Sequence, residues 1–443
     1  MRYALGRDVR IDGHRIIGGS PPSVLRITDH GQRIIDDIVS GNEVSRGVLL
    51  DRLLALGIVH PQPDLRSVHA VDGERLVTVV IPTLGALSYA SDHGLGADGV
   101  IVVDDCSDPS VVGATIRTAT NLGPGGARNL GLSQVTTEFC AFVDADVDTG
   151  DGAAWLEALL GHFDDARVAA VAPRVRSRDT RGMRGTYERR HGPLDMGDEP
   201  GPVAAGTRLG YVPSAALICR TEVIRSLGGF DATLRTGEDV DLVWRLVDAG
   251  HVVRYDPSVE VSHDPRPTWQ AWAKQRIGYG ASTAPLARRH PGRLAPVVTS
   301  PWSAAACLAP LVVRRPHIGF AISAGLIGLA GQRLSQRLPE LDRATSVSTV
   351  ARGTARTADA IARATRRAWW PLIIAGMPWR PVRRLVIAAL LAARSPLAAL
   401  DDVVHGIGVW KGMIAERSIA PLLPRFVSGR PERHTTSTYH LTP

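Results

Sequence analysis

The chain has 443 residues, of which 44% are hydrophobic and 21% charged, enough apolar material for up to about three domains with cores of their own. This composition excludes a wholly disordered chain, and Gly and Pro without a fixed period exclude a collagen-like one. Residues 301–443 hold 19 basic and 7 acidic side chains, whereas the first 300 hold 32 and 37. An acidic body with a basic, apolar C-terminal third favours an anionic membrane surface over nucleic acid as a partner.

Residues 1–66 predict a small α+β unit. Strand-like pieces occur at Tyr3–Leu5 and Arg15–Ile17, and Asp-Gly and Gly-Gly dipeptides near them are hairpin signals. Thr28 can cap a helix that ends at Gly41, and Ser45 can cap a second one. This order of strands and helices is typical of a winged helix. A DNA-reading role is less favoured, because Arg only slightly outnumbers Asp and Glu in this unit.

Residues 76–290 predict the domain that carries chemistry. The runs LVTVVIPT, GVIVVDD and FCAFVDAD are unbroken apolar strands that end in polar residues, and helical patterns separate them. Such strands indicate a parallel sheet buried on both faces, with ligands bound at the carboxyl ends of its strands. The residues at those ends are Thr83, Asp104, Asp105, Asp144 and Asp146.

Paired acids follow two of these strands. Asp144 and Asp146 are two residues apart, and two oxygen ligands suit Mg²⁺ or Mn²⁺ bound together with a diphosphate. The alternative is that such acids only begin a turn and cap the next helix. Asp104 and Asp105 can accept hydrogen bonds from a ribose or a base edge, although solvated turn acids would look the same.

Three further features could complete a site at this edge. The segment NLGPGGARNLGL joins a Gly-rich turn to a helix start, where free N–H groups favour an anion. Arg128 is expected in the first turn of that helix and could reach a phosphate or base, although the segment taken alone is more often a turn than a site. In GEDVDL, Asp239 could act as a general base, although acids in a first helical turn commonly serve as dipole partners. His263 could complete a metal shell, although a lone histidine is more often structural.

The C-terminal region, residues 295–430, predicts helices. Its apolar stretches run for 9 to 14 residues between Arg pairs, so none reaches the roughly 20 residues of a membrane-spanning helix. Buried core helices are the first interpretation of this pattern, interfacial or re-entrant helices the second, and true membrane spans the least favoured one. Residues 431–443 predict a flexible tail.

Four cysteines at widely spaced positions show no CxxC spacing, so we expect neither a disulfide framework nor a structural zinc site. This cysteine usage fits a reducing cytoplasm. The opening residues MRYALGRDVRIDG lack the apolar run of a signal peptide, and we therefore expect that the chain is not secreted.

Taken in order, VVIPT, VVDDCS, NLGPGGARNLG, FVDADV, GGFD, GEDVDL and a later histidine resemble an inverting family 2 glycosyltransferase of the GT-A fold. The resemblance implies a mixed sheet with flanking helices and a nucleotide-sugar donor. It places the donor at Pro82, Thr83, Asp104, Asp105, Arg128, Asp144 and Ala145, with the choice between Asp104 and Asp105 for the nucleoside left open. It places Mn²⁺ or Mg²⁺ at Asp146 and His263, and catalysis at Asp239 with Glu238 beside it.

Two departures from the family pattern concern the acceptor. The segment 84–99 is shorter than the helix usual there, and the QxxRW motif of processive members is replaced by Gln275-Arg276-Ile277 near Trp272. Asp241, Trp272, Gln275 and Arg276 are therefore acceptor-side candidates, and a processive reaction is disfavoured.

The N-terminal unit resembles the peptide-recognition domains of pathways that modify ribosomally made peptides, which bind a leader as an added strand. Combined with the transferase motifs and the basic tail, it resembles the glycosyltransferases of mycofactocin biosynthesis. That resemblance implies UDP-glucose as donor, a small precursor peptide or peptide-derived redox cofactor precursor as acceptor, β-linked products, and the cytoplasmic face of the membrane as location. The alternatives are a membrane polysaccharide or lipid-linked sugar transferase and a non-catalytic peptide-binding scaffold.

Overall fold

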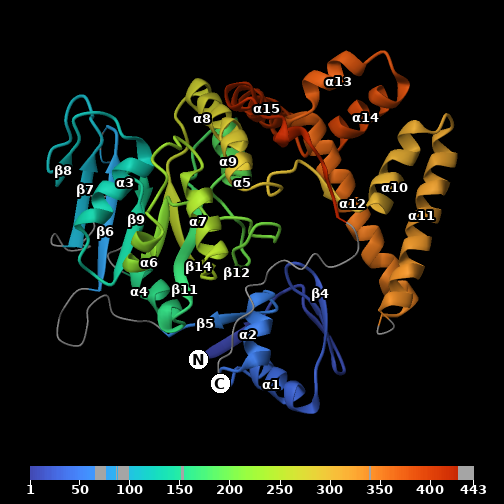
Figure 1. The fold of residues 1–443 in the computed structure, drawn as a ribbon, viewed down its shortest axis with the longest axis horizontal. Helices are drawn as coiled ribbons and strands as arrows, with labels where there is room; N and C mark the ends of the chain where they lie inside the picture. Colours follow the sequence, from blue (N-terminus) through green and yellow to red (C-terminus); the bar gives the residue numbers. More distant parts are fainter. Residues whose placement is uncertain (65–75, 86, 88–98, 151–153, 339–340, 428–443) are drawn as a thin grey trace. The chain divides into compact units, whose positions relative to one another are not determined.

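The computed structural model describes residues 1–64, 76–85, 87, 99–150, 154–338 and 341–427 (Figure 1). Internal contacts divide the chain into two units, Met1–Arg266 and Pro267–Pro443. Most of segment 84–99 and the expected tail at 431–443 lie outside the described residues. The domain boundaries at residues 66, 290 and 430 stay predictions.

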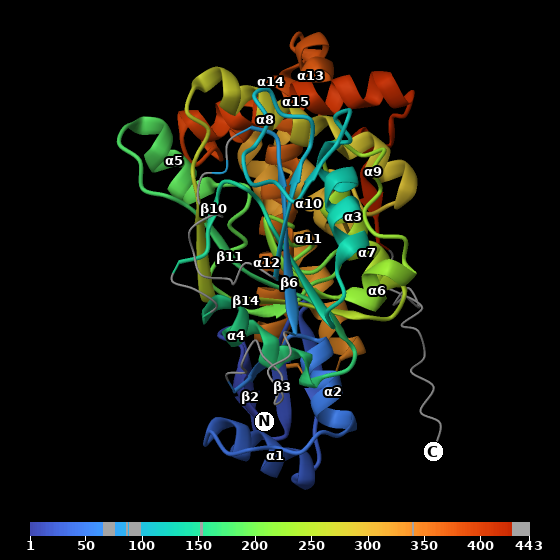
Figure 2. The same cartoon turned by 90° about the vertical axis from the view of Figure 1, so that its left-hand side faces the viewer.

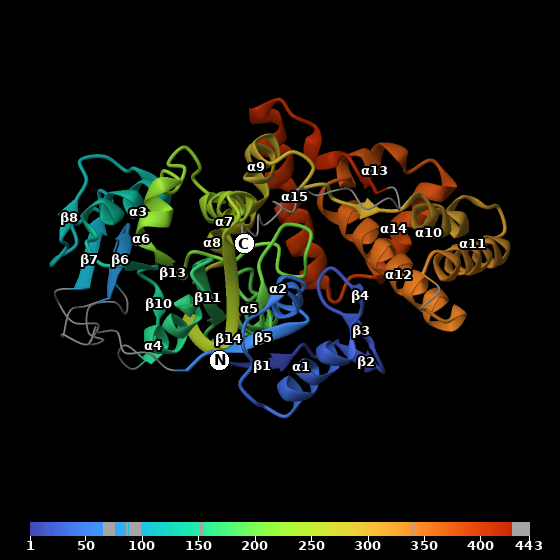
Figure 3. The same cartoon turned by 60° about the horizontal axis from the view of Figure 1, so that its bottom comes forward.

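The first part of unit Met1–Arg266 has its own hydrophobic core, which includes Ile16, Ile35 and Leu53. Its elements are β1 (Arg2–Leu5), β2 (Arg10–Asp12), β3 (Arg15–Gly18), β4 (Ser23–Arg26), α1 (Asp29–Val39), α2 (Val48–Ala55) and β5 (Val59–Gln62). Strands β2, β3 and β4 form one antiparallel sheet, and β1 pairs with β5. Figure 3 shows α1 and α2 beside β1 and β5.

The expected caps of these two helices have different outcomes. Thr28 caps α1 as predicted, because its Oγ1 accepts a hydrogen bond from the Gly31 N–H at 3.2 Å. The predicted Ser45 cap is wrong. Helix α2 begins only at Val48, so the capping position falls on Gly47, which has no side chain to offer.

A mixed sheet forms the second part of this unit. Its strands are β6 (Val77–Thr83), β7 (Val100–Asp104), β8 (Ile116–Arg117), β9 (Phe139–Val143), β10 (Val147–Asp148), β11 (Val168–Ser177), β12 (Gly201–Pro202), β13 (Ala216–Arg220) and β14 (Val252–His263). They lie in the order β10-β14-β11-β13-β9-β6-β7-β8, and β12 pairs with β14. The sheet core consists of apolar side chains such as Val79, Ile81, Phe139 and Ala141, which explains the unbroken apolar runs in the sequence.

The parallel arrangement expected from the strand runs holds for only part of this sheet. Strands β6, β7, β8 and β9 pair in parallel, but β13 is antiparallel to both β9 and β11. Between β11 and β13 the chain forms α5 (Met183–His191) and β12. Strand β13 then lies in the sheet between β11 and β9. An unbroken apolar run indicates a strand that is buried on both faces. Parallel and antiparallel central strands share this burial, so the run does not indicate the direction of the strand.

The remaining helices of this unit flank the sheet. They are α3 (Gly123–Gln134), α4 (Ala154–Leu160), α6 (Thr221–Ser226) and α7 (Glu238–Asp248), and a short 3₁₀ turn covers Gly161–Asp164. Helix α3 lies against β6 and β7, and α4 contacts β11 and β14 (Figure 2). Helix α7 contacts α3 and β14.

Unit Pro267–Pro443 is helical, with short strand pieces. Its helices are α8 (Trp269–Ala281), α9 (Thr283–Arg289), α10 (Pro301–Val312), α11 (Pro316–Arg337), α12 (Arg343–Arg367), α13 (Trp370–Gly376), α14 (Arg380–Leu391) and α15 (Pro396–Glu416). Strands β15 (Val298–Thr299) and β16 (Arg425–Phe426) pair in parallel, and a 3₁₀ turn covers Ala420–Leu422. Helices α10 and α11 pack together and against α12.

Candidate active site

The carboxyl ends of β6, β7 and β9 lie at one edge of the sheet, as the strand pattern predicts. Thr83 pairs in register with Asp104, and the Asp105 N–H donates to the Thr83 carbonyl at 2.8 Å. Pro82 precedes Thr83 in β6, and Asp144 directly follows β9. The residues predicted to bind the nucleotide-sugar donor therefore lie at the ends of three neighbouring strands of one sheet.

Asp104 is buried and holds the loop that follows β7. Its carboxylate accepts hydrogen bonds from the N–H groups of Ser107 at 2.8 Å and Val111 at 3.1 Å, and from Arg117 at 2.7 Å. Burial alone would raise its pKa, but the hydrogen bonds from Ser107 and Val111 and the charge of Arg117 outweigh it and lower the pKa of Asp104 to about 2. Asp104 is therefore ionised at any physiological pH.

Asp105 holds the turn that leads into α3. Its carboxylate accepts hydrogen bonds from the N–H groups of Leu122 at 2.7 Å and Gly123 at 2.8 Å and from the Thr118 hydroxyl at 3.1 Å. Gly123 has a φ of +82°, a backbone conformation that favours glycine. Asp105 thus fixes the start of the helix that carries Arg128.

Arg128 joins three elements at the centre of the site. Its guanidinium donates to Glu238 at 2.7 Å and to Asp144 at 2.5 Å, so α3, the turn after β9 and the start of α7 meet on one side chain. The guanidinium also lies over the Phe230 ring, 5.3 Å from its centroid. Burial would lower its pKa, but the charges of Asp144 and Glu238 outweigh burial and raise the pKa of Arg128. Since α3 begins at Gly123, Arg128 lies in the second helical turn and not in the expected first one.

Asp239 lies in the first turn of α7, next to Glu238. Its carboxylate accepts hydrogen bonds from the N–H groups of Val240 at 2.8 Å and Ser214 at 3.4 Å. Burial and the negative charge of Glu238 raise the pKa of Asp239 to about 7, against the opposing effect of Arg128. A carboxyl group whose pKa lies near neutrality is well suited to accept a proton at physiological pH.

Asp146 and His263 come close because the strand pieces that flank them pair. Strand β10 runs antiparallel to β14 and sets Val147 opposite His263. Burial and the charge of Asp144 raise the pKa of Asp146, and its carboxylate also lies 3.4 Å from Arg266. Ala145 separates the two aspartates in the turn.

The donor set at this turn fits a divalent cation. His263 is buried and its Nδ1 lies 3.2 Å from the neighbouring Asp264 carbonyl, while its Nε2 has no hydrogen-bond partner in the described part of the chain. A carboxylate with a raised pKa beside a buried, unpartnered imidazole nitrogen suits a metal that also binds substrate oxygens. Among the described residues, no group of three or more His, Cys, Asp and Glu side chains is placed to hold a metal by itself.

The acceptor-side candidates lie in two different units. Asp241 is buried on α7 and accepts from Arg245 at 2.7 Å. Trp272, Gln275 and Arg276 lie on α8 in unit Pro267–Pro443, where the Arg276 guanidinium lies over Trp272 at 5.3 Å and donates to Asp401 of α15 at 2.9 Å. Gln275 accepts from Arg276 at 3.1 Å.

Two further side chains shape the site without having been predicted. Asn129 exchanges two hydrogen bonds with the backbone of Phe230, at 2.7 and 2.8 Å, and so fixes the GGFD turn against α3. Arg117 holds Asp104 and donates to the Ser107 carbonyl at 2.9 Å. Asn129 stands inside the motif NLGPGGARNLG and could have been singled out there, whereas no pattern in the sequence marks Arg117.

All four cysteines, Cys106, Cys140, Cys219 and Cys307, are described and free, as the spacing predicts. Cys140 and Cys219 face each other across β9 and β13 as buried thiols.

Comparisons with known proteins match this chain to glycosyltransferases. The family model "Glycosyl transferase family 2" matches residues 92–225. The chain is 37% identical over 465 residues to "Pre-mycofactocin glycosyltransferase" of Mycobacterium tuberculosis, strains CDC 1551 / Oshkosh and ATCC 25618 / H37Rv, covering 95% of this chain and 96% of the relative. A shorter match, 25% identical over 194 residues, is to "Polypeptide N-acetylgalactosaminyltransferase 15" of Mus musculus, covering 37% of this chain and 30% of that protein.

Solved structures give more distant matches. One is "Mannosyltransferase PcManGT from Pyrobaculum calidifontis in complex with GDP-Man and Mn2+", with a TM-score of 0.36, 17% identity, and coverage of 74% of this chain and 87% of that one. Another is "Crystal structure of S. aureus TarS 1-349 in complex with UDP", with a TM-score of 0.34, 15% identity, and coverage of 77% and 92%.

The match along nearly the whole length of the curated relative decides the family. Together with the mixed sheet and its flanking helices, it confirms the expected GT-A fold class and a nucleotide-sugar-dependent transferase. The chain belongs to the pre-mycofactocin glycosyltransferases of glycosyltransferase family 2.

Proposed function

We propose that this transferase moves glucose from UDP-glucose to a hydroxyl group of a peptide-derived redox cofactor precursor, with inversion at the anomeric carbon and a β-linked product. The acceptor oxygen forms a bond to the anomeric carbon, the bond from that carbon to the diphosphate breaks, and the acceptor proton moves to Asp239. The nucleoside diphosphate leaves with the electron pair of the broken bond. Repetition on the product would give a β-linked oligosaccharide.

One observation carries this proposal. Arg128 holds Asp144 and Glu238 at 2.5 and 2.7 Å, and this arrangement keeps Asp239, with its raised pKa, beside the acids at the strand ends. In this proposal the proton acceptor therefore lies at the edge of the sheet where a donor would bind. Glu238 has a supporting part in this scheme, because its charge helps to raise the pKa of Asp239.

The donor would lie along the carboxyl ends of β6, β7 and β9. Pro82 and Thr83 end the first of these strands, and Asp104 and Asp105 order the loops beside the second. Asp144 and Ala145 follow the third. In this proposal these residues, with Arg128, contact the nucleoside and the ribose.

Asp146 and His263 would hold Mn²⁺ or Mg²⁺. The raised pKa of Asp146 and the unpartnered Nε2 of the buried His263 support this assignment. A divalent cation in such a site stabilises the negative charge that develops on a departing diphosphate.

The N-terminal strands and helices would bind the precursor peptide. Within the described residues, β2 and β4 each pair with β3 alone, so each leaves one strand edge without a partner strand. An extended peptide can add to such an edge through main-chain hydrogen bonds. This feature supports peptide recognition as a part of the proposed function.

A membrane surface is the proposed location. Large apolar side chains are exposed on the helices of unit Pro267–Pro443, among them Phe320 on α11, Ile374 on α13 and Leu391 on α14. One described helix, α11, has the length and apolar content to cross a membrane, and 11% of its most apolar stretch is buried. A single such helix is weak evidence for a span, and we therefore propose attachment to the cytoplasmic face of an anionic membrane.

The direct test is transfer by the purified protein, assayed with UDP- and GDP-sugars in the presence and absence of Mn²⁺ or Mg²⁺. Asp239→Asn should lower the transfer rate by about 100-fold or more, because general-base catalysis contributes at least that much, while donor binding stays close to that of the unmodified protein. Glu222→Gln is the matched control, since Glu222 is an acid of the same unit with 84% of its side chain exposed. Undiminished transfer by Asp239→Asn would disprove the assignment of the base.

A further inference from the structure

A half-open pocket of about 400 Å³ lies where the N-terminal strands and helices meet the sheet. Tyr3, Arg46 and Leu54 line it from the N-terminal side, and Asp165 and Arg254 line it from the side of the sheet. Both sides belong to unit Met1–Arg266. A pocket of this volume is large enough for a small organic ligand.

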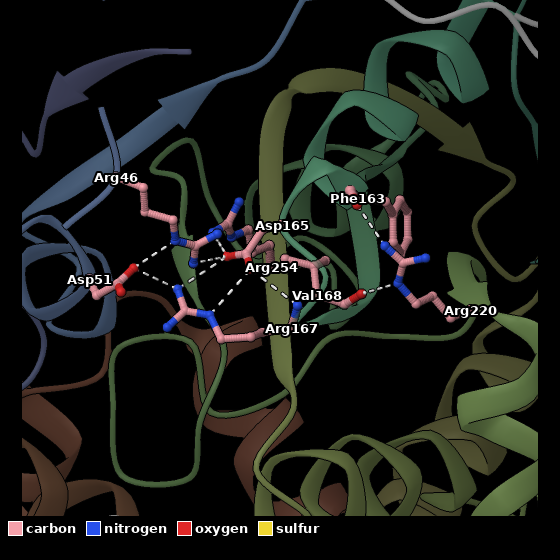
Figure 4. A network of polar contacts seen from close by, with 8 residues as sticks. All are labelled: Arg46, Asp51, Phe163, Asp165, Arg167, Val168, Arg220 and Arg254. Carbon is pink, nitrogen blue, oxygen red and sulfur yellow. Dashed lines mark hydrogen bonds and ion pairs between the residues drawn. The ribbon is translucent and has the colours of Figure 1, made fainter. Parts of the chain in front are cut away.

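Three of the residues that line the pocket, Arg46, Asp165 and Arg254, belong to a network of charged side chains (Figure 4). Asp165 is buried and accepts from Arg46 at 2.8 Å, from Arg254 at 2.9 Å and from Arg167 at 3.2 Å. Asp51 accepts from both Arg46 and Arg167 at 2.9 Å. Three guanidinium groups thus face two carboxylates, and of these side chains Asp165 and Arg254 are the buried ones, whereas Arg46, Arg167 and Asp51 are partly exposed.

Arg254 is the incompletely satisfied member of the network. The residue is 7% exposed, its Nη2 donates to Asp165, and its Nη1 is a buried donor with no acceptor in the part of the chain that the structure describes. Burial lowers the pKa of Arg254, and the nearby Asp165 charge offsets this effect only in part. A buried guanidinium with a free N–H is the group that an anionic ligand would satisfy.

We propose that this pocket binds a small ligand that carries one carboxylate. Its oxygens would accept hydrogen bonds from Arg254 and Arg46, and its apolar part would lie against Tyr3, Val44 and Leu54. A planar carboxylate matches the geometry of a guanidinium group. A phosphate fits less well, because Glu43 and Asp164 also line the pocket and would repel a dianion. Both of these acids are exposed to solvent, so they weaken the attraction of a monoanion only modestly.

This pocket is distinct from the candidate active site. Arg254 stands near the beginning of β14 and His263 at its end. Arg254 pairs with Val171 of β11 and His263 with Ser177, six residues further along β11, so at roughly 3.3 Å per residue about 20 Å of sheet separates the two. A carboxylate in the pocket therefore takes no part in the transfer reaction, and the inference goes beyond the proposed function and stands or falls without it.

The test uses the full chain and two probes of equal size, N-acetyl-leucine and its uncharged amide, titrated by ligand-observed NMR. N-acetyl-leucine should bind and the amide should bind at least tenfold more weakly. Arg254→Gln should weaken binding of the acid at least tenfold. Arg7→Gln should leave it unchanged, since Arg7 pairs with Asp198 at 2.7 Å across the same junction but does not line the pocket.

A second variant keeps the test valid if Arg254→Gln fails to fold. Val44→Trp places a bulky group in the pocket without changing any charge, and it should block the acid as well. Equal binding of acid and amide, absence of binding by the acid, or unaltered binding by a folded Arg254→Gln or Val44→Trp variant would overturn the proposal. Inorganic phosphate that displaces N-acetyl-leucine at equal concentration would overturn the assignment to a carboxylate.

Discussion

At the scale of single residues, Arg128 allows several acids to share one site. Asp144 and Glu238 both lie within hydrogen-bond distance of its guanidinium, and Asp239 lies next to Glu238. Without a buried cation these carboxylates would repel one another. The Arg128 guanidinium pairs directly with the carboxylates of Asp144 and Glu238. Its charge acts on Asp239 only from a distance, and Asp239 therefore keeps a raised pKa.

This difference predicts a pH dependence of catalysis. Asp239 must be ionised to accept a proton, and burial together with Glu238 raises its pKa to about 7. The transfer rate at saturating substrates should therefore fall as the pH decreases through that value, at a pH where an ordinary aspartate would still be fully ionised. The measurement is kcat as a function of pH between 5 and 9.

The stability of the folded chain should respond in the opposite direction. A carboxyl group with a raised pKa in the folded state stabilises the fold below its unfolded pKa, and this contribution is lost as the pH rises through the folded pKa. Asp239→Asn should therefore be more stable than the unmodified chain above pH 7, and its advantage should shrink toward acid pH. A rate that stays constant down to pH 5 would contradict the role of Asp239 as the base. A stability difference between the two chains that does not change with pH would contradict its raised pKa.

At the scale of elements, the packing of α3 on β6 depends on one close approach. Gly131 faces the sheet, and a Cβ at this position would lie 2.3 Å from Cγ1 of Val80, a fully buried strand residue. The glycine-rich motif thus has a packing role at its end in addition to the turn at its beginning. Because α3 carries Arg128, this contact also sets the depth of the guanidinium in the site.

Gly131→Ala should consequently destabilise the chain by about 1–3 kcal/mol, the usual effect of overpacking a core, and should also lower activity through Arg128. Gly353→Ala is the matched control, because Gly353 is a helical glycine of α12 with open space around its Cβ position. The same change there should be neutral or stabilise its helix by up to about 1 kcal/mol. Urea unfolding of both variants measures the difference, and equal effects would refute the close-approach argument.

The elements also show how far the sequence alone could predict the fold. Apolar runs located β6, β7 and β9 and the polar residues at their ends, because a buried strand and the end of burial both leave a pattern in the sequence. The antiparallel course of β13 was not predictable, since a fully buried strand has no alternation that would reveal its direction.

The candidate site was predictable to a similar extent. The acids and Arg128 stand in motifs, and the structure brings Arg128, Asp144 and Glu238 into direct contact. The Arg117 contact with Asp104 comes from a two-residue strand and depends on long-range pairing, which local patterns do not encode. The Ser45 cap failed because helix starts are sensitive to shifts of a few residues.

At the scale of the whole molecule, charge and apolar surface are unevenly distributed along the chain. The last 143 residues carry 19 basic and 7 acidic side chains, and the same region exposes large apolar side chains such as Trp379 and Leu391. Some of the arginines have structural roles, as Arg384 donates to the carbonyls at the end of α10 at 2.7 to 3.5 Å. Exposed apolar groups together with a basic excess are typical of a surface that binds anionic lipid.

Membrane attachment therefore predicts two separable contributions to vesicle binding. The full chain should cosediment with vesicles that contain anionic lipid, and raised salt should release part of it, because salt screens only the electrostatic contribution. Leu391→Glu should weaken binding several-fold, since it adds a charge to a side chain that is 81% exposed at the end of α14. Thr349→Glu adds the same charge at an exposed polar position of α12 and should weaken binding less, by its electrostatic part alone. Equal losses for the two variants would mean that charge alone drives attachment, and absence of cosedimentation would rule out the proposed membrane surface.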